Sequence, residues 1–159
     1  MSTSITRMFG AVAALGALAM GGTVGVTASP ARVAKAPTAY VVNRDDTVTP
    51  INTATNKALK PIKIGSGLNT IAITRDGKTA YVTLGHAAHV AVVDVPTRKI
   101  LGYILVGKRS WGLGMSRDEK TLYVANGFGD DVTVIDLKTR KATVSIPVGR
   151  IPWGVVIDD

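Results

Sequence analysis

The sequence predicts an all-β protein that is built from repeated units. Ser66–Gly107 and Lys108–Gly149 can be placed over one another without a gap, at a shift of 42 along the sequence, and are then identical at 16 positions. Self-similarity at a fixed period is typical of repeat architectures. Each unit also contains four short runs rich in β-branched residues that are separated by turn residues. After Ala28 no stretch has a helical period. The fold class is therefore all-β.

The N-terminal segment predicts export. A short polar start that ends at Arg7 precedes an uncharged run from Met8 to Ala28, and small residues close that run. This is the three-part layout of a secretory signal peptide. The alternative is a retained membrane anchor, because about 20 apolar residues can span a bilayer, but the many Gly and Ala residues make this run only weakly hydrophobic. We expect residues 1–28 to be a signal peptide, residues 29–38 to be a linker, and the protein to be periplasmic, at the cell surface or secreted.

The repeats are expected to fill residues 39–159, as units 39–65, 66–107 and 108–149 and a partial unit 150–159. The turn Arg75-Asp76-Gly77-Lys78 is typical of a hairpin between antiparallel strands. Asp94 precedes the turn Pro96–Lys99 and is placed to accept hydrogen bonds from the turn amides or from the hydroxyl of Thr97. In the second unit the predicted strands are Ile71–Thr74, Ala80–Leu84, Val90–Val95 and Ile100–Val106.

Four antiparallel strands in a unit of about 42 residues predict a blade of a β-propeller. Pro61 and Pro147 fall in the last strand of their units, where an edge position tolerates a missing backbone donor. The first strand is then innermost, and Gly112 and Gly114 suit the crowding around the axis. The chain is long enough for about three blades, whereas the smallest common closed propeller has about four. We expect a partial propeller.

The two ends of this partial propeller are complementary. The first unit lacks an innermost strand, and the tail Trp153–Asp158 is expected to be an innermost strand without the rest of its blade. One explanation is a homodimer in which the tail of each chain completes the first blade of the other, so that two chains close a six-bladed ring. The other explanation is that the chain is the front portion of a longer product, which the stop at a turn position favours.

Three segments resemble the signature of the YVTN β-propeller repeat family. They are Tyr40-Val41-Val42-Asn43, Tyr81-Val82-Thr83-Leu84 and Tyr123-Val124-Ala125-Asn126, and the resemblance covers residues 39–159. It implies an exported or surface-associated propeller; related propellers include lactonases and subunits of redox enzymes. Because a fold does not carry an activity with it, the resemblance leaves the function open.

Aromatic and cationic residues gather at the connections between units. Trp111 and Trp153 are related by the same shift of 42 and so occupy the same place in successive units. Packing between blades would explain them, as the sheet core would explain Tyr40, Tyr81 and Tyr123. The functional interpretation is a pair of aromatic walls for a ligand, with nearby cations as anchors for an anion. The candidate ligand-binding residues are Lys108, Arg109, Trp111, Arg150 and Trp153.

The opposite end of the sheets carries the turns richest in Lys and Arg. The whole chain has a formal charge of +8, and a basic surface can attract polyanions such as nucleic acid, cell-wall polymer or phospholipid head groups. Solvation of repeated turns explains the same residues, and no aromatic residues alternate with these cations for base stacking. The candidate polyanion-binding residues are Arg98, Lys99, Arg140 and Lys141.

The composition favours a non-catalytic role. The chain has no Cys and two His, which excludes a thiolate nucleophile and Cys-ligated metals. His86 and His89 share a loop without an apparent third ligand, and we expect no catalytic residue, metal or cofactor. A lactonase-like metal site is the main enzymatic alternative; its candidate ligands are Asn43, Asn69, Asn126, Asp130 and Asp131. The sequence thus predicts a binding or scaffold module with an unknown protein or anionic envelope ligand as its partner.

Overall fold

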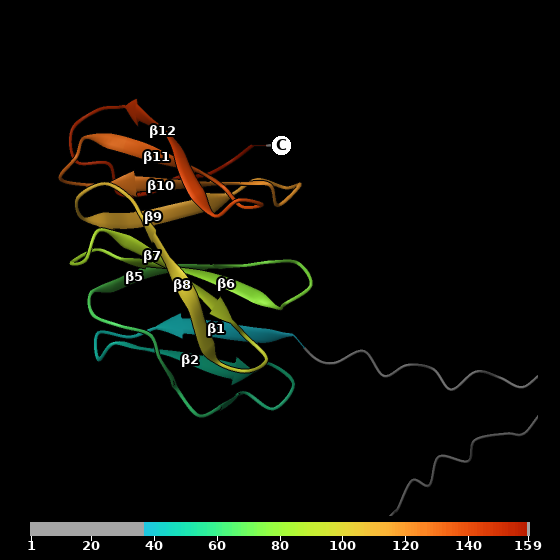
Figure 1. The fold of residues 1–159 in the computed structure, drawn as a ribbon. Coiled ribbons are helices and arrows are strands. Elements are labelled where there is room, and N and C mark those ends of the chain that lie inside the picture. Colours follow the sequence, from blue (N-terminus) through green and yellow to red (C-terminus); the bar gives the residue numbers. More distant parts are fainter. Residues whose placement is uncertain (1–36, 159) are drawn as a thin grey trace, which may run out of the picture. The chain divides into compact units, whose positions relative to one another are not determined.

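The computed structural model describes residues 37–158, which form three four-stranded antiparallel sheets and no helix (Figure 1). The prediction of an all-β chain with four-stranded units is confirmed. The first sheet consists of β1 (Thr38–Val42), β2 (Thr47–Asn52), β3 (Lys57–Ala58) and β4 (Ile62–Lys63). The middle sheet consists of β5 (Leu68–Ile73), β6 (Thr79–Leu84), β7 (His89–Asp94) and β8 (Lys99–Leu105). The last sheet consists of β9 (Ser110–Met115), β10 (Thr121–Asn126), β11 (Asp131–Asp136) and β12 (Lys141–Pro147).

The strands of the middle and last sheets follow one another in space as they do in the sequence, each paired with the next. The hairpin predicted at Arg75–Lys78 joins β5 and β6, in the register Ile73↔Ala80. In the hairpin between β7 and β8, both the amide and the hydroxyl of Thr97 donate to a carboxylate oxygen of Asp94, each at 2.8 Å. The predicted turn chemistry is therefore present.

The middle sheet is buried on both faces because it lies between the other two (Figure 1). Side chains alternate along a strand, so Val82 of β6 packs against the first sheet in a cluster with Val48. The adjacent Tyr81 packs against the last sheet in a cluster with Leu122. Tyr81 is 4% exposed, as expected of a core residue, while Tyr40 and Tyr123 are half-buried.

The structure corrects two details of the expected strand count. The outer strand of the first sheet is broken into β3 and β4, both paired with β2, and Pro61 lies in the break, since it has no N–H to donate to the ladder. The tail Trp153–Asp158 forms no strand and pairs with none of the described strands.

The tail nevertheless lies beside β9, where an innermost strand was expected. A Cβ added at Gly112 would come within 2.5 Å of the Gly154 Cα, and one added at Gly114 within 3.1 Å of the Val155 carbonyl oxygen. The expectation that glycine suits the crowding at these two positions is confirmed.

The predicted signal peptide (1–28) and most of the predicted linker (29–38) lie outside the described residues. Thr38, the last residue of that linker, already pairs with Asn52 at the start of β1. Within residues 37–158, no helix has the length and apolar character needed to cross a membrane.

Candidate ligand-binding site

The site is built at the connections that lead into β9 and into the tail. Arg109 has φ 57° and Ile151 has φ 54°, and Gly67, at the same place in the preceding repeat, has φ 74°. This left-handed conformation turns the chain sharply and is uncommon for residues with a side chain. Its recurrence shows that the repeat imposes the turn at each connection. As a result Trp111 and Trp153 stand two residues after equivalent turns.

The loop that follows β10 holds Trp111 in place. A Cβ at Gly127 would come within 2.3 Å of the Trp111 ring, so only glycine leaves room for the indole. The Gly127 amide donates to the Arg109 carbonyl (2.9 Å), and the Phe128 amide donates to the Lys108 carbonyl (3.1 Å). Phe128 therefore meets Trp111 edge to face, with ring centroids 5.7 Å apart and planes at 72°.

Trp153 stacks on Trp111, with centroids 4.4 Å apart and an interplanar angle of 27°. At this distance the two rings are in contact and leave no gap for a ligand. They therefore do not form the two walls of a slot, which was the functional interpretation of the sequence. Trp153 is 72% exposed and Phe128 is 59% exposed. The surface that a ligand can reach is therefore the uncovered part of Trp153 and the ring of Phe128.

Cationic side chains adjoin these rings. The Arg109 guanidinium carbon lies 5.1 Å from the centroid of Phe128, within the range of a cation–π contact. Arg109 also lines an open pocket of about 330 Å³ with Lys108 and His86. Because Lys108 and Arg109 are cationic and no acidic side chain of the described residues lines the pocket, it attracts anions.

The structure thus brings together four of the five residues predicted for this site: Lys108, Arg109, Trp111 and Trp153. Arg150 is exposed and does not line the pocket. Sequence reasoning missed Phe128 and weighed His86 only as a metal ligand. Both belong to loops that follow the second strand of a unit. The shift of 42 gives Phe128 and His86 the same position in successive repeats. This equivalence was a signal in the sequence that the two loops lie at the same end of the sheets.

The amides weighed as metal ligands are engaged in the fold. Asn43 donates to the hydroxyls of Thr47 (3.0 Å) and Thr49 (2.7 Å), and Asn69 donates to the carbonyls of Gly67 and Ser110. Asn126 and Asp131 bond to each other at 2.9 Å, and Asp130 accepts from the Ile151 amide at 2.8 Å. In the part of the chain that the structure describes, no three His, Cys, Asp or Glu residues are grouped as a metal site.

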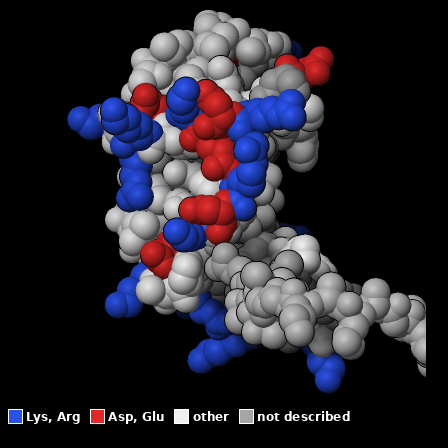
Figure 2. All heavy atoms as spheres, turned by 90° about the vertical axis from the view of Figure 1, so that its right-hand side faces the viewer, with Lys and Arg blue, Asp and Glu red and all other residues white. Residues whose placement is uncertain are grey.

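At the other end of the sheets, acidic and basic side chains are intermixed (Figure 2). Arg98, Lys99, Arg140 and Lys141 are all exposed there, and Arg98 donates to the Lys60 carbonyl at 3.3 Å. Asp94 and Asp136 lie at the same turns, where hydrogen bonds from Thr97 and Thr139, first of all from their amides, lower the pKa of each carboxyl. The acids stay ionised and offset part of the basic charge.

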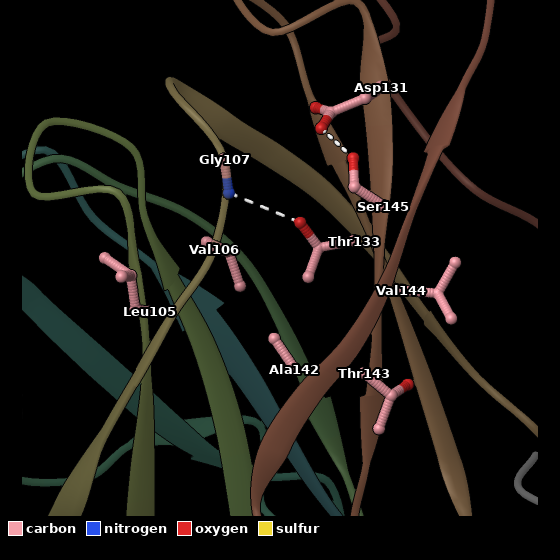
Figure 3. A pocket seen from close by; sticks show the side chains of 9 residues that line it. All are labelled: Leu105, Val106, Gly107, Asp131, Thr133, Ala142, Thr143, Val144 and Ser145. Atoms are coloured by element: carbon pink, nitrogen blue, oxygen red, sulfur yellow. Dashed lines mark hydrogen bonds between the residues drawn. The ribbon is translucent and has the colours of Figure 1, made fainter.

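A second pocket, of about 380 Å³, opens between β8 and the pair β11–β12 (Figure 3). The Gly107 amide donates to the Thr133 hydroxyl at 3.3 Å across it, and the Ser145 hydroxyl donates to Asp131. Among residues 37–158, the only ionisable side chain that lines it is Asp131, whose carboxylate already accepts from Asn126 and Ser145. This pocket is therefore a gap between adjacent outer strands with little chemistry for recognition.

No protein family matches the sequence, and no curated protein matches it. Solved structures do match. The hydrazine synthase of Kuenenia stuttgartiensis superposes with a TM-score of 0.69 at 26% identity, over 74% of this chain and 34% of that one. The chain has the fold of a partial β-propeller.

A dihydro-heme d1 dehydrogenase, NirN, solved in complex with DHE, superposes with a TM-score of 0.58 at 18% identity. The match covers 70% of this chain and 25% of that one, so the chain spans about a third or less of each of these neighbours. Both neighbours are named as enzymes. The comparison therefore does not support the expectation that the chain is non-catalytic.

Proposed function

We propose that the chain is an exported, YVTN-type β-propeller module that binds its ligand without catalysis. The three signature-like segments support the assignment to this repeat type, because they lie at equivalent strands of successive blades. Tyr81–Leu84 and Tyr123–Asn126 fall within β6 and β10, and Tyr40–Val42 falls within β1, with Asn43 directly after it. The basis for export is the layout of residues 1–28.

The observation that carries the binding role is the pair of exposed rings, Trp153 and Phe128, beside the basic pocket. Aromatic faces favour planar or sugar rings, and Lys108, Arg109 and His86 favour an anionic group. The ligand class that combines both features is a ring that carries an acidic group, either as a small molecule or as a side chain or terminus of a partner protein.

Tryptophan fluorescence tests this proposal directly, because both tryptophans of the chain lie in the cluster. The probes are benzoate and glucuronate as ring anions, inorganic phosphate as an anion without a ring, and benzyl alcohol as a ring without a charge. We expect saturable quenching or a wavelength shift with a ring anion, and weaker binding of phosphate and benzyl alcohol.

The variants come from the chain's own repeats. Arg109→Gly restores the residue found at Gly67 and suits the left-handed backbone; Trp153→Asn restores the residue found at Asn69. Each should weaken binding of the ring anion about tenfold or more, equivalent to about 1.4 kcal/mol. Lys141→Ala, at the other end of the sheets, is the matched control and should not change it. Equal binding by all variants, or no saturable response to any probe, would contradict the proposal.

An enzymatic role is the second candidate, favoured by the 26% identity to a segment of a synthase. A lactonase-like or redox-associated module would be a fragment of a larger active unit. For the lactonase-like form, the chain should hydrolyse a sugar lactone with added Mg²⁺, Ca²⁺ or Zn²⁺ and lose this activity with a chelator. Rates equal to the uncatalysed reaction with every metal would remove it.

A further inference from the structure

Each sheet of the protein has two faces, which we name by chain order: the leading face points to the next sheet, and the trailing face points to the previous one. Inside the chain these faces pack together twice. The first sheet has no sheet before it within the described residues, and its trailing face is open. Val41 of this face is 43% exposed, whereas Val82 and Val124 at the same repeat position are 0% exposed.

The leading face of the last sheet is open in the same way. In the middle sheet, Tyr81 and Ile104 are each 4% exposed because the last sheet covers them. At the same positions of the last sheet, Tyr123 is half-buried and Ile146 is 41% exposed. The side chains that make the interface between sheets are therefore present at both ends, without a partner within residues 37–158.

The backbone repeats this complementarity. The tail lies against β9 at Gly112 and Gly114, in the position of the innermost strand of a following blade, but has no strand to pair with. In the first sheet β1 is an edge strand; its counterparts β6 and β10 each pair with an innermost strand, β5 and β9. One end supplies the strand that the other end lacks.

We propose that a second copy of this chain occupies these surfaces, with the tail of each copy completing the first blade of the other. The register follows from the repeats. Ile71 pairs with Val82 and Leu113 pairs with Val124, so Val155 pairs with Val41 of the second copy. Val41 then faces the open last sheet of the copy that supplies the tail, where its exposed surface becomes buried.

The blade count selects two copies. Closed propellers have about four to eight blades, so two copies of the three sheets formed by residues 37–158 fall within this range and three copies exceed it. A head-to-tail interface that closes forms a ring, and closure removes the free strand edges that otherwise promote aggregation. This assembly rests on the sheet faces and the tail backbone and does not require the proposed ligand, although Trp153 lies on the tail that it uses.

Light scattering coupled to gel filtration measures the assembly directly. We expect a single species of twice the chain mass for the mature chain and for Leu101→Lys, and the mass of one chain for Val41→Lys. Leu101 is the matched control because it is 48% exposed on β8 of the middle sheet, away from both open faces. Circular dichroism verifies that each variant is folded. A monomer for the unaltered chain, or a series of increasing masses, would overturn the proposal.

Cysteine cross-linking tests the register, since the chain has no cysteine of its own. Val41 and Val155 lie in the first sheet and beside the last sheet, so Val41→Cys/Val155→Cys should form only disulfides between chains when oxidised. Mixing the two single variants should give the same covalent dimer. Val41→Cys/Val156→Cys is the control, because adjacent residues of an extended segment point to opposite faces. Equal cross-linking of both pairs, or none with Val155→Cys, would contradict the register.

Discussion

At the scale of single residues, the asparagine of the repeated signature has a structural role. Asn126 donates to Asp131 (2.9 Å) and to Thr133 (2.8 Å), and Asn43 makes the equivalent bonds to two threonines. The middle unit instead has Leu84, with Ala91 in the place of Thr133. The chain thus uses either a polar set or an apolar set at this position, since a buried polar group without a partner is costly.

This alternation predicts a coupling between two residues. Asn126→Leu should destabilise the protein by about 1–3 kcal/mol, because the buried Thr133 hydroxyl loses the shorter of the two hydrogen bonds donated to it and keeps only that from the Gly107 amide. Asn126→Leu/Thr133→Ala copies the middle unit, and its destabilisation should fall short of the sum of the single changes by about 0.5 kcal/mol or more. Chemical unfolding measures both.

Leucine fits this position, because Leu84 packs against Gly65 as Asn126 packs against Gly107. A steric misfit of leucine is therefore not expected. Strictly additive effects of the two substitutions would show that Asn126 and Thr133 are not coupled, and would contradict this prediction.

The turn aspartates predict an acid-sensitive stability. The amides of Thr97 and Thr139 and then their hydroxyls lower the pKa of Asp94 and Asp136 below the ordinary value of 3.8. A lowered folded pKa contributes stability that is present above about pH 3.8 and is lost as the pH falls through the folded value. Asp94→Asn/Asp136→Asn keeps an acceptor oxygen but does not titrate.

The double variant should therefore lose less of its thermal stability than the unaltered chain between about pH 5 and about pH 2. Thermal unfolding followed by circular dichroism at a series of pH values measures this. Parallel curves for the two proteins would place the acid sensitivity elsewhere.

At the scale of elements, the left-handed residues mark where one element gives way to the next. Arg98 and Arg140 (φ 59° and 55°) stand at equivalent hairpins, as do Ala88 and Asp130 (φ 53° and 51°). Because non-glycine residues adopt this conformation reluctantly, the ladders on both sides of each turn must hold it. These turns recur at a spacing of 42 residues. This regularity explains why the hairpins of the middle sheet could be predicted from turn residues in the sequence.

The contact between β9 and the tail predicts that one glycine substitution displaces the tail and another leaves it in place. Gly112→Ala should displace the tail, because the added Cβ would lie 2.5 Å from Gly154, and Trp153 should lose its stack on Trp111. Gly154→Ala should leave the stack intact, since nothing lies within 4 Å of a Cβ there. Tryptophan fluorescence reports the stack in both variants. A red shift with Gly154→Ala equal to that with Gly112→Ala would show that the tail is not held at β9.

At the scale of the whole molecule, charge is distributed with both signs at the turn-rich end (Figure 2). The formal charge of +8 still favours contact with polyanions. If the turns bind nucleic acid, Arg98→Glu/Lys99→Glu/Arg140→Glu/Lys141→Glu should reduce affinity for a short DNA duplex and flatten its salt dependence. Fluorescence anisotropy at several salt concentrations measures both. Affinity that does not change with salt or with these reversals would remove this role.

The sequence located the repeat, the hairpins of the middle sheet and the glycines beside the tail, because each depends on short-range turn chemistry or on a pattern that recurs in successive units. It also placed Trp111 and Trp153 together. It missed Phe128, because the loop that carries it reaches the site only through hydrogen bonds to the Lys108 and Arg109 carbonyls.

The sequence by itself determined the all-β repeat and the order of strands within each sheet, since β-branched runs and turn residues act locally. Only the tertiary structure decided that the tryptophan rings stack instead of forming a slot, that the tail lies unpaired on β9, and which side chains remain open at each end. These outcomes depend on how one sheet packs on the next, which is a property of distances between residues far apart in the chain.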